Sequence, residues 1–237
     1  MKIKVLFNSL GVQEDLSVGW GLSFLIDNRV LFDTGSKGEF LKNNINKLKV
    51  DCSSLESVVI SHDHWDHTGG LLEVLKVNPD IKVYGCSGFS VDFKSKMSEG
   101  SSNYFEIDDF SRIATGIYTT GEMIGTYKGD NISEQALIIK TEKGVSVVTG
   151  CAHPGIIKIL EKVKSQLSIK EFYAVFGGFH LKEFSIKEIE AIADKFIDFK
   201  VNKVGATHCS GDKAEKCFQD VYKDNFLSLR VGDVVTI

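Results

Sequence analysis

Short apolar runs rich in Val, Ile, Leu and Phe recur along the chain, and between them lie longer segments whose apolar residues repeat with the spacing of a helix. The short runs predict strands at residues 3–7, 22–26, 30–32, 58–60, 81–84, 113–119, 136–139, 145–148, 172–176, 204–206 and 231–237. The helical spacing predicts helices at residues 38–48, 70–77, 155–167, 185–199 and 212–222. Ser185, with Glu188 three residues later, forms the pattern of a capping box and marks the start of the fourth helix.

The order of these elements predicts a mixed α/β fold. Early strands are joined by short turns such as Asp27-Asn28, which favours antiparallel pairs, whereas strands and helices alternate in the second half. We therefore expect two mixed β-sheets packed as a sandwich, with helices on the outside. The chain has no internal repeat, low-complexity tract or Pro/Ser-rich linker, so one domain over residues 1–237 is predicted. Residues 85–111, rich in Ser and aromatic residues, predict a surface excursion that could cover a site.

The composition narrows the class of protein. With 43% hydrophobic and 25% charged residues and a net charge of −4, the chain matches a water-soluble globular protein. It has no apolar stretch of the roughly 18 residues that span a membrane and no secretory signal at its start, so we expect a cytoplasmic protein. The lysines are scattered, which disfavours nucleic acid as a partner. Five cysteines at irregular spacing, without a C-x-x-C pair, favour reduced thiols. Nothing in the sequence addresses the oligomeric state.

All six histidines lie at the ends of predicted strands. His62, His64 and His67 follow the strand at 58–60, His153 the strand at 145–148, His180 the strand at 172–176 and His208 the strand at 204–206. Loops at strand ends gather at one edge of a sheet, so residues distant in sequence can converge there on a common site.

The densest cluster is the H-x-H-x-D-H motif in residues 61–70 (SHDHWDHTGG). In an extended segment His62 and His64 point to the same side, so their imidazoles can bind one metal ion. The chain then bends into a helix, which aims Asp66 and His67 elsewhere, toward a second ion nearby; glycines at 69 and 70 would permit the bend. Imidazole and carboxylate donors without an adjacent thiolate favour a catalytic metal site over a closed structural one.

The motif, residues 31–35 (LFDTG), and the downstream His153 and His208 resemble the metallo-β-lactamase superfamily over nearly the whole chain. Residues 19–23, 149–156, 177–181 and 207–211 are similar to its branch of 7,8-dihydropterin-6-methyl-4-(β-D-ribofuranosyl)aminobenzene 5′-phosphate synthase-like proteins. The superfamily resemblance implies an αββα sandwich with one or two metal ions at one edge of the sheets, and hydrolysis of esters, thioesters, phosphodiesters or lactams. The branch implies a role in the synthesis of methanopterin-type cofactors.

These features together predict a binuclear metallohydrolase acting on a small molecule. We expect His62, His64 and His153 on one ion and Asp66, His67 and His208 on the other. Zinc is the expected ion, with manganese or iron as alternatives. A divalent ion lowers the pKa of bound water to about 7, so a bridging hydroxide would attack the substrate. Asp66 would orient it or accept its proton, and His180 would donate to the oxyanion or phosphoryl oxygen, with metal ligation by His180 as an alternative.

Several points stay open at the level of sequence. The resemblance makes Cys151 a candidate for the bridging ligand, since it stands where the superfamily usually has a ligand at a strand end; Glu134 is another candidate, and Asp130 lies in the same region. The same resemblance implies that Asp33 occupies a position whose side chain usually supports the metal site by hydrogen bonding.

Three rival functions remain beside the hydrolase. The first is a metal-dependent transferase that joins a dihydropterin diphosphate to a ribofuranosylaminobenzene phosphate. The second is a non-catalytic metal-binding protein. The third, a di-iron oxygen-reducing enzyme, is disfavoured because relatives of that type have Glu at the place of His64.

Overall fold

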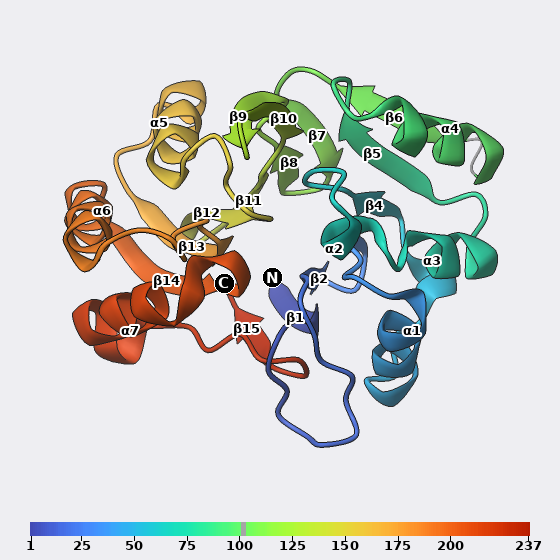
Figure 1. The fold of residues 1–237 in the computed structure, drawn as a ribbon, viewed down its shortest axis with the longest axis horizontal. Coiled ribbons are helices and arrows are strands. Elements are labelled where there is room, and N and C mark those ends of the chain that lie inside the picture. Colours follow the sequence, from blue (N-terminus) through green and yellow to red (C-terminus); the bar gives the residue numbers. More distant parts are fainter. Residues whose placement is uncertain (101–102) are drawn as a thin grey trace. The chain divides into compact units, whose positions relative to one another are not determined.

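The computed structural model describes residues 1–100 and 103–237, which divide into two compact units (Figure 1). Unit 1 comprises residues 1–109 and 229–236, and unit 2 comprises residues 110–228 together with residue 237. Each unit has its own large mixed sheet, so the expected mixed α/β class with two sheets and helices is confirmed. The single domain over residues 1–237 stays a prediction.

Unit 1 is built on a seven-stranded sheet in the order β15-β1-β2-β3-β4-β5-β6. The strands β15, β1, β2 and β3 pair antiparallel, whereas β3 to β6 run parallel. The tight turn between β2 and β3 has positive φ at Asp27 and Asn28. The strands are β1 (Lys2–Phe7), β2 (Ser23–Ile26), β3 (Val30–Phe32), β4 (Ser57–Val59), β5 (Lys82–Cys86), β6 (Tyr104–Ile107) and β15 (Val234–Thr236). The helices are α1 (Gly38–Lys47), α2 (Trp65–Thr68), α3 (Leu71–Val77), α4 (Val91–Gly100) and the 3-10 turn at Cys52–Ser54.

The expectation of a surface excursion at 85–111 is wrong. The segment contains α4 and β6, and β6 pairs parallel with β5 at the edge of the sheet. Phe89 and Phe93 are buried in the core of unit 1 with their rings in edge-to-face contact, 5.2 Å between centroids. The aromatic residues of this segment therefore serve packing, because an aromatic side chain contributes a large apolar area to a core. Residues 101–102 of the segment lie outside the described residues.

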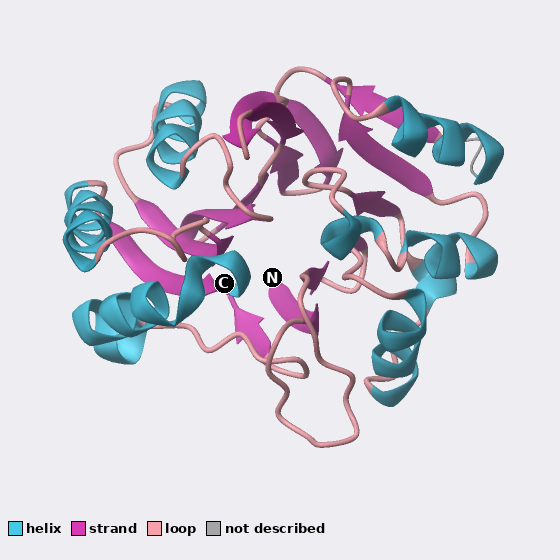
Figure 2. Cartoon of the chain, in the orientation of Figure 1, coloured by secondary structure: helices cyan, strands magenta, loops and turns pink. Residues whose placement is uncertain are grey.

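Unit 2 is built on a six-stranded sheet in the order β14-β13-β12-β11-β8-β7, with a separate β9–β10 hairpin. Figure 2 shows the three helices of this unit along one side of the sheet, where their apolar faces join the strands in one core. The strands are β7 (Ser111–Ala114), β8 (Ile117–Thr119), β9 (Met123–Tyr127), β10 (Asp130–Glu134), β11 (Leu137–Thr141), β12 (Gly144–Thr149), β13 (Phe172–Gly178) and β14 (Val201–Thr207). The helices are α5 (Ile156–Leu167), α6 (Ile186–Asp198), α7 (Gly211–Tyr222) and 3-10 turns at His208–Ser210 and Lys223–Asn225.

The predicted alternation of strand and helix in the second half is confirmed, since β12, β13 and β14 run parallel with α5 and α6 between them. The capping box of α6 is confirmed as well: the Ser185 side chain accepts from the Glu188 backbone N–H, and the Glu188 side chain accepts from the Ser185 backbone N–H. The single strand predicted at 113–119 is wrong, because Gly116 turns the chain at positive φ between the antiparallel β7 and β8. Within the described residues, no helix is long and apolar enough to cross a membrane.

Candidate functional site

The H-x-H-x-D-H motif of unit 1 lies where β4 ends and α2 begins, as the sequence predicts. Its three imidazoles gather closely: the His62 ring centroid lies 4.8 Å from that of His64 and 4.1 Å from that of His67. The Asp66 carboxylate lies 3.7 Å from His67 Nε2. The turn into α2 thus brings His67 beside His62, whereas the sequence led us to expect that His67 is aimed away from His62. Three imidazoles and one carboxylate are donors that divalent transition metals accept.

Asp33 supports this cluster from the end of β3. Its carboxylate accepts hydrogen bonds from the Ser61 backbone N–H at 2.7 Å and the Ser61 hydroxyl at 2.7 Å, and it bonds His67 Nδ1 at 2.6 Å. Burial raises the pKa of Asp33, against the lowering effect of His67 and Ser61. Because Nδ1 of His67 is held by a carboxylate, Nε2 is left as the atom that can bind a metal ion. The predicted supporting role of Asp33 therefore agrees with its contacts.

The glycines after the motif act through close packing, which corrects the expected reason for them. Neither Gly69 (φ −62°) nor Gly70 (φ −94°) adopts a conformation that needs glycine. A Cβ at Gly69 would lie 2.1 Å from the Ser36 backbone oxygen, and one at Gly70 would lie 2.4 Å from the Thr34 oxygen. Glycine is required here because the backbones of the two loops touch.

The second cluster lies in unit 2, at the carboxyl ends of the three parallel strands β12, β13 and β14. Their ends are in register, since Thr149 pairs with Gly177 and Gly178 pairs with Thr207. The residues after these ends are the predicted ones: Cys151 and His153 after β12, His180 after β13 and His208 after β14. The structure thus brings together within unit 2 the four candidate residues that the sequence separates by up to 57 positions.

The donor atoms of this cluster lie close enough to one another to bind a common metal ion. Those of Cys151, His153 and His180 lie within 4.8 Å of one another, and so do those of Cys151, His208 and Cys209. The His153 and His180 ring centroids are 4.6 Å apart. Cys151 is 5% exposed and its thiol belongs to both groups, which supports a site role over simple packing.

Glu134, at the end of β10, organises the loop that carries His153. Its Oε1 accepts from the backbone N–H groups of Cys151 and Ala152 at 2.9 and 2.7 Å. Its Oε2 accepts from the His153 N–H at 2.8 Å and bonds His153 Nδ1 at 2.8 Å. Burial alone would raise the pKa of Glu134, but the hydrogen bonds from His153 and Cys151 outweigh it and lower the pKa. With both oxygens engaged, Glu134 is suited to orient His153 rather than to bridge metal ions.

The sequence did not single out Cys209 or Tyr127, which also belong to this region. The Cys209 thiol is buried and donates to the Cys151 carbonyl at 3.6 Å. Burial would raise the pKa of Cys209, but hydrogen bonds with the side chains of Cys151 and His180 outweigh it and lower the pKa. The bond to Cys209 in turn raises the pKa of His180. The Tyr127 ring centroid lies 5.4 Å from that of His153. The position of Cys209 directly after His208 was the signal available in the sequence.

Strained backbone marks both clusters. Asp33, Ala152, His180 and His208 have φ between 53° and 60°, in the left-handed region. Such residues cost on the order of 1 kcal/mol each and persist where the surrounding structure holds them. All four lie at the loops after strand ends that carry or support the candidate ligands.

Comparison with known proteins places the chain among metallo-β-lactamase proteins. Residues 19–208 match the profile described as the metallo-beta-lactamase superfamily. The sequence is 32% identical to the 7,8-dihydropterin-6-methyl-4-(beta-D-ribofuranosyl)-aminobenzene-5'-phosphate synthase of Methanocaldococcus jannaschii, over 91% of this chain and 89% of that protein.

Solved structures give the same placement. The chain is similar to Tm1679, described as a metal-dependent hydrolase of the beta-lactamase superfamily, with a TM-score of 0.83 and 28% identity over 100% of this chain and 99% of that one. It is also similar to human tRNase Z, short form, with a TM-score of 0.65 over 100% and 99% of the two chains, but at 12% identity this likeness concerns the fold alone.

Proposed function

Because the chain belongs to the metallo-beta-lactamase superfamily, we propose that it is a metal-dependent hydrolase that cleaves an ester, thioester or phosphodiester bond in a small molecule. The observation that carries the proposal is the pairing of buried carboxylates with histidines. Asp33 holds Nδ1 of His67, and Glu134 holds Nδ1 of His153. Histidines that bind metals usually donate their other ring nitrogen to such a group, which fixes the tautomer and leaves Nε2 for the metal.

We propose the ligand set that the sequence predicts. His62, His64 and His153 would hold one ion, and Asp66, His67 and His208 the other, with Cys151 as a further donor. The support is that the proposed donors within each unit lie close to one another. Imidazole and carboxylate suit zinc, manganese and iron, and a thiolate from Cys151 would favour zinc among them.

The side chains of the two clusters have separate tasks in this proposal. Bound divalent ions would lower the pKa of a coordinated water and polarise the substrate. The Asp66 carboxylate orients the attacking water or accepts its proton. His180 donates a hydrogen bond to the oxygen that gains negative charge. Asp33 and Glu134 act only through the histidines that they orient.

A second reaction class is favoured by the relative named as a synthase, which is 32% identical over 91% of this chain. In a transferase the same side chains would hold the divalent ions, which would neutralise a diphosphate leaving group, and an arylamine rather than water would attack. Both reactions use the same donors, so the residues of the clusters do not separate them. The identity of the attacking group does.

Metal content tests the site independently of any substrate. We expect about two metal ions per chain by elemental analysis of freshly purified protein, with fewer in His64→Ala and in His208→Ala. Asp66→Asn should also lose metal, whereas Asp63→Asn, the same change in the same loop, should keep it. The Asp63 carboxylate accepts from the Ser90 N–H at 2.8 Å and is not a predicted ligand. Protein that binds no metal after incubation with zinc or manganese would refute the proposal.

Product analysis then separates the two reactions. A panel of esters, thioesters and phosphodiesters is incubated in water enriched in oxygen-18, and a parallel reaction contains a dihydropterin diphosphate with an arylamine. A hydrolase incorporates labelled oxygen into its product, whereas a transferase forms a carbon–nitrogen bond. Two bound ions with no turnover in either reaction would favour the non-catalytic metal-binding protein.

A further inference from the structure

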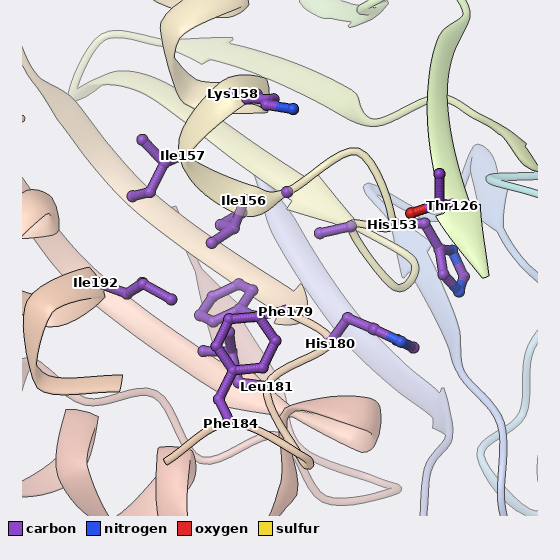
Figure 3. A pocket seen from close by; sticks show the side chains of 12 residues that line it. Thr126, His153, Ile156, Ile157, Lys158, Phe179, His180, Leu181, Phe184 and Ile192 are labelled. Carbon is purple, nitrogen blue, oxygen red and sulfur yellow. The ribbon is translucent and has the colours of Figure 1, made fainter. Parts of the chain in front are cut away.

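A cavity of about 380 Å³ opens beside the candidate ligands of unit 2 (Figure 3). It lies between the start of α5, the loop after β13 and α6, and every residue that lines it belongs to unit 2. Most of its wall is apolar, formed by Ile156, Ile157, Phe179, Leu181, Phe184 and Ile192. Its volume lies in the range of small-molecule sites, which is about 300 to 1,000 Å³.

The polar side chains that line the cavity are few, namely Thr126, His153, Lys158 and His180. His153 and His180 contribute their imidazoles, which Figure 3 shows on the same side of the cavity, away from Ile192. Lys158, on the first turn of α5, contributes a primary ammonium group. None of the lining residues is acidic, and within the described part of the chain Lys158 has no ion pair. The cavity thus combines an apolar wall with one ammonium group, while Glu134 and Glu183, the carboxylates that act on its His180, do not line it.

The aromatic side chains indicate the shape of a ligand. Phe179 is buried and fixed in the core between Phe196 and Phe218, whereas Phe184 is 38% exposed. An exposed ring beside a rigid one gives a ligand a large apolar contact with little loss of side-chain freedom. Planar apolar groups suit such a wall, because aromatic rings pack favourably in offset or edge-to-face arrangements.

We propose that this cavity binds the part of the substrate that does not react, namely a planar apolar ring system that carries an anionic substituent. The ring would lie against Phe184 and Ile192, and the anion would pair with Lys158. His153 and His180, on the side of the cavity away from Ile192, would face the reacting bond. This inference rests on the proposed function, since it assigns the substrate class of that site, and it makes Lys158, Phe184 and Ile192 specificity-determining residues.

Binding of a probe that cannot be hydrolysed tests the inference without turnover. The probe is 2-naphthalenesulfonate, which combines a ring with an anion, and its affinity for the metal-loaded protein is measured by calorimetry. 2-Naphthol lacks the anion and methanesulfonate lacks the ring, so both should bind more weakly. We expect Phe184→Ala to weaken binding of the probe by about tenfold. Lys158→Gln should weaken binding of the sulfonate by a similar factor but leave the affinity for 2-naphthol unchanged.

Matched controls come from α6, next to the cavity. Ile186, 60% exposed on α6, does not line the cavity, so Ile186→Ala should bind the probe as the wild type does, whereas Ile192→Ala should bind it more weakly. Lys187→Gln is the corresponding control for Lys158→Gln. All variants should keep the metal content and the melting temperature of the wild type. The probe should also raise the KM of any substrate found, without lowering kcat.

The outcomes separate this inference from the proposed function. A wild type that does not bind the probe, or binding that Phe184→Ala and Lys158→Gln leave unchanged, would overturn the inference even if metal-dependent turnover is found. Binding that requires these residues would support the cavity as a ligand site even if the metal analysis contradicts the hydrolase.

Discussion

Replacement of Glu134 by Gln tests whether a buried carboxylate fixes the ligand atom of His153. Glu134 is 1% exposed, and its two oxygens meet four donors: three backbone N–H groups and Nδ1 of His153. Gln keeps the size and shape of the side chain but replaces one acceptor oxygen by an NH₂ group. That group cannot accept the two bonds that Oε2 accepts in the wild type.

The expected effect has two components. If the Gln NH₂ faces His153, the backbone N–H of His153 loses its acceptor, and an unsatisfied buried donor costs about 1 to 3 kcal/mol. The imidazole can restore one bond by accepting at Nδ1, but its proton then moves to Nε2, the atom expected to bind the metal ion. Loss of such an orienting partner typically lowers metal affinity by about 10- to 100-fold. A loss of about 2 kcal/mol would lower the melting temperature of a chain of this size by roughly 4 to 8 °C.

Two measurements check the reasoning. The zinc affinity is measured by competition with a chromophoric chelator, and the melting temperature is measured on metal-free protein. Glu142→Gln is the control, because Glu142 is exposed in the β11–β12 turn of the same unit. If Glu134→Gln binds zinc within twofold of the wild type and melts at the same temperature, the hydrogen bonds of Glu134 do not orient His153 and the argument from paired carboxylates fails.

Three further predictions address packing, capping and metal. Gly69→Ala should lower the free energy of unfolding by about 2 kcal/mol or more in urea titrations, because the new Cβ would lie 2.1 Å from the Ser36 oxygen; an unchanged midpoint would mean that the two loops separate without cost. Ser185→Ala removes the capping box with Glu188 and should cost about 1 kcal/mol while metal content stays constant, so a loss of metal would contradict a purely structural role. Removal of metal by a chelator should lower the melting temperature, since free metal at about 1,000 times its Kd stabilises the folded state by about 4 kcal/mol; equal melting temperatures would argue against a folded-state site.

The elements of the fold that could be predicted are those encoded by residues that are neighbours in the sequence. The buried strands β3, β12 and β13 are runs of β-branched and aromatic residues bounded by turns, and the start of α6 carries its capping box in four residues. The clustering of the H-x-H-x-D-H side chains was likewise predictable, because these residues lie within six consecutive positions of the sequence. Convergence of His153, His180 and His208 was predictable from the rule that the ends of parallel strands share an edge.

The missed elements have weak or masked local signals. Helix α4 buries Phe93 and Met97, which are four residues apart, but its other positions are mostly polar, so the segment resembled a loop. The β9–β10 hairpin is partly exposed and lacks a long apolar run; its signal was the turn at Lys128-Gly129, where both residues have positive φ. The role of Gly69 depends on contact with a loop more than thirty residues earlier in the chain, which no local pattern encodes.

The paired carboxylates argue that these histidines are built as ligands and not merely packed in the core. A core histidine needs only one partner for each ring nitrogen, and a backbone carbonyl or a hydroxyl is sufficient for that. Here each unit instead buries a carboxylate against Nδ1 of a histidine. Asp33 lies 34 residues before His67 in the sequence, and Glu134 lies 19 residues before His153. Burying a charge is costly unless it is compensated, so two such placements are difficult to explain by packing. A cation held at Nε2 of each histidine would compensate each carboxylate through the imidazole that lies between them.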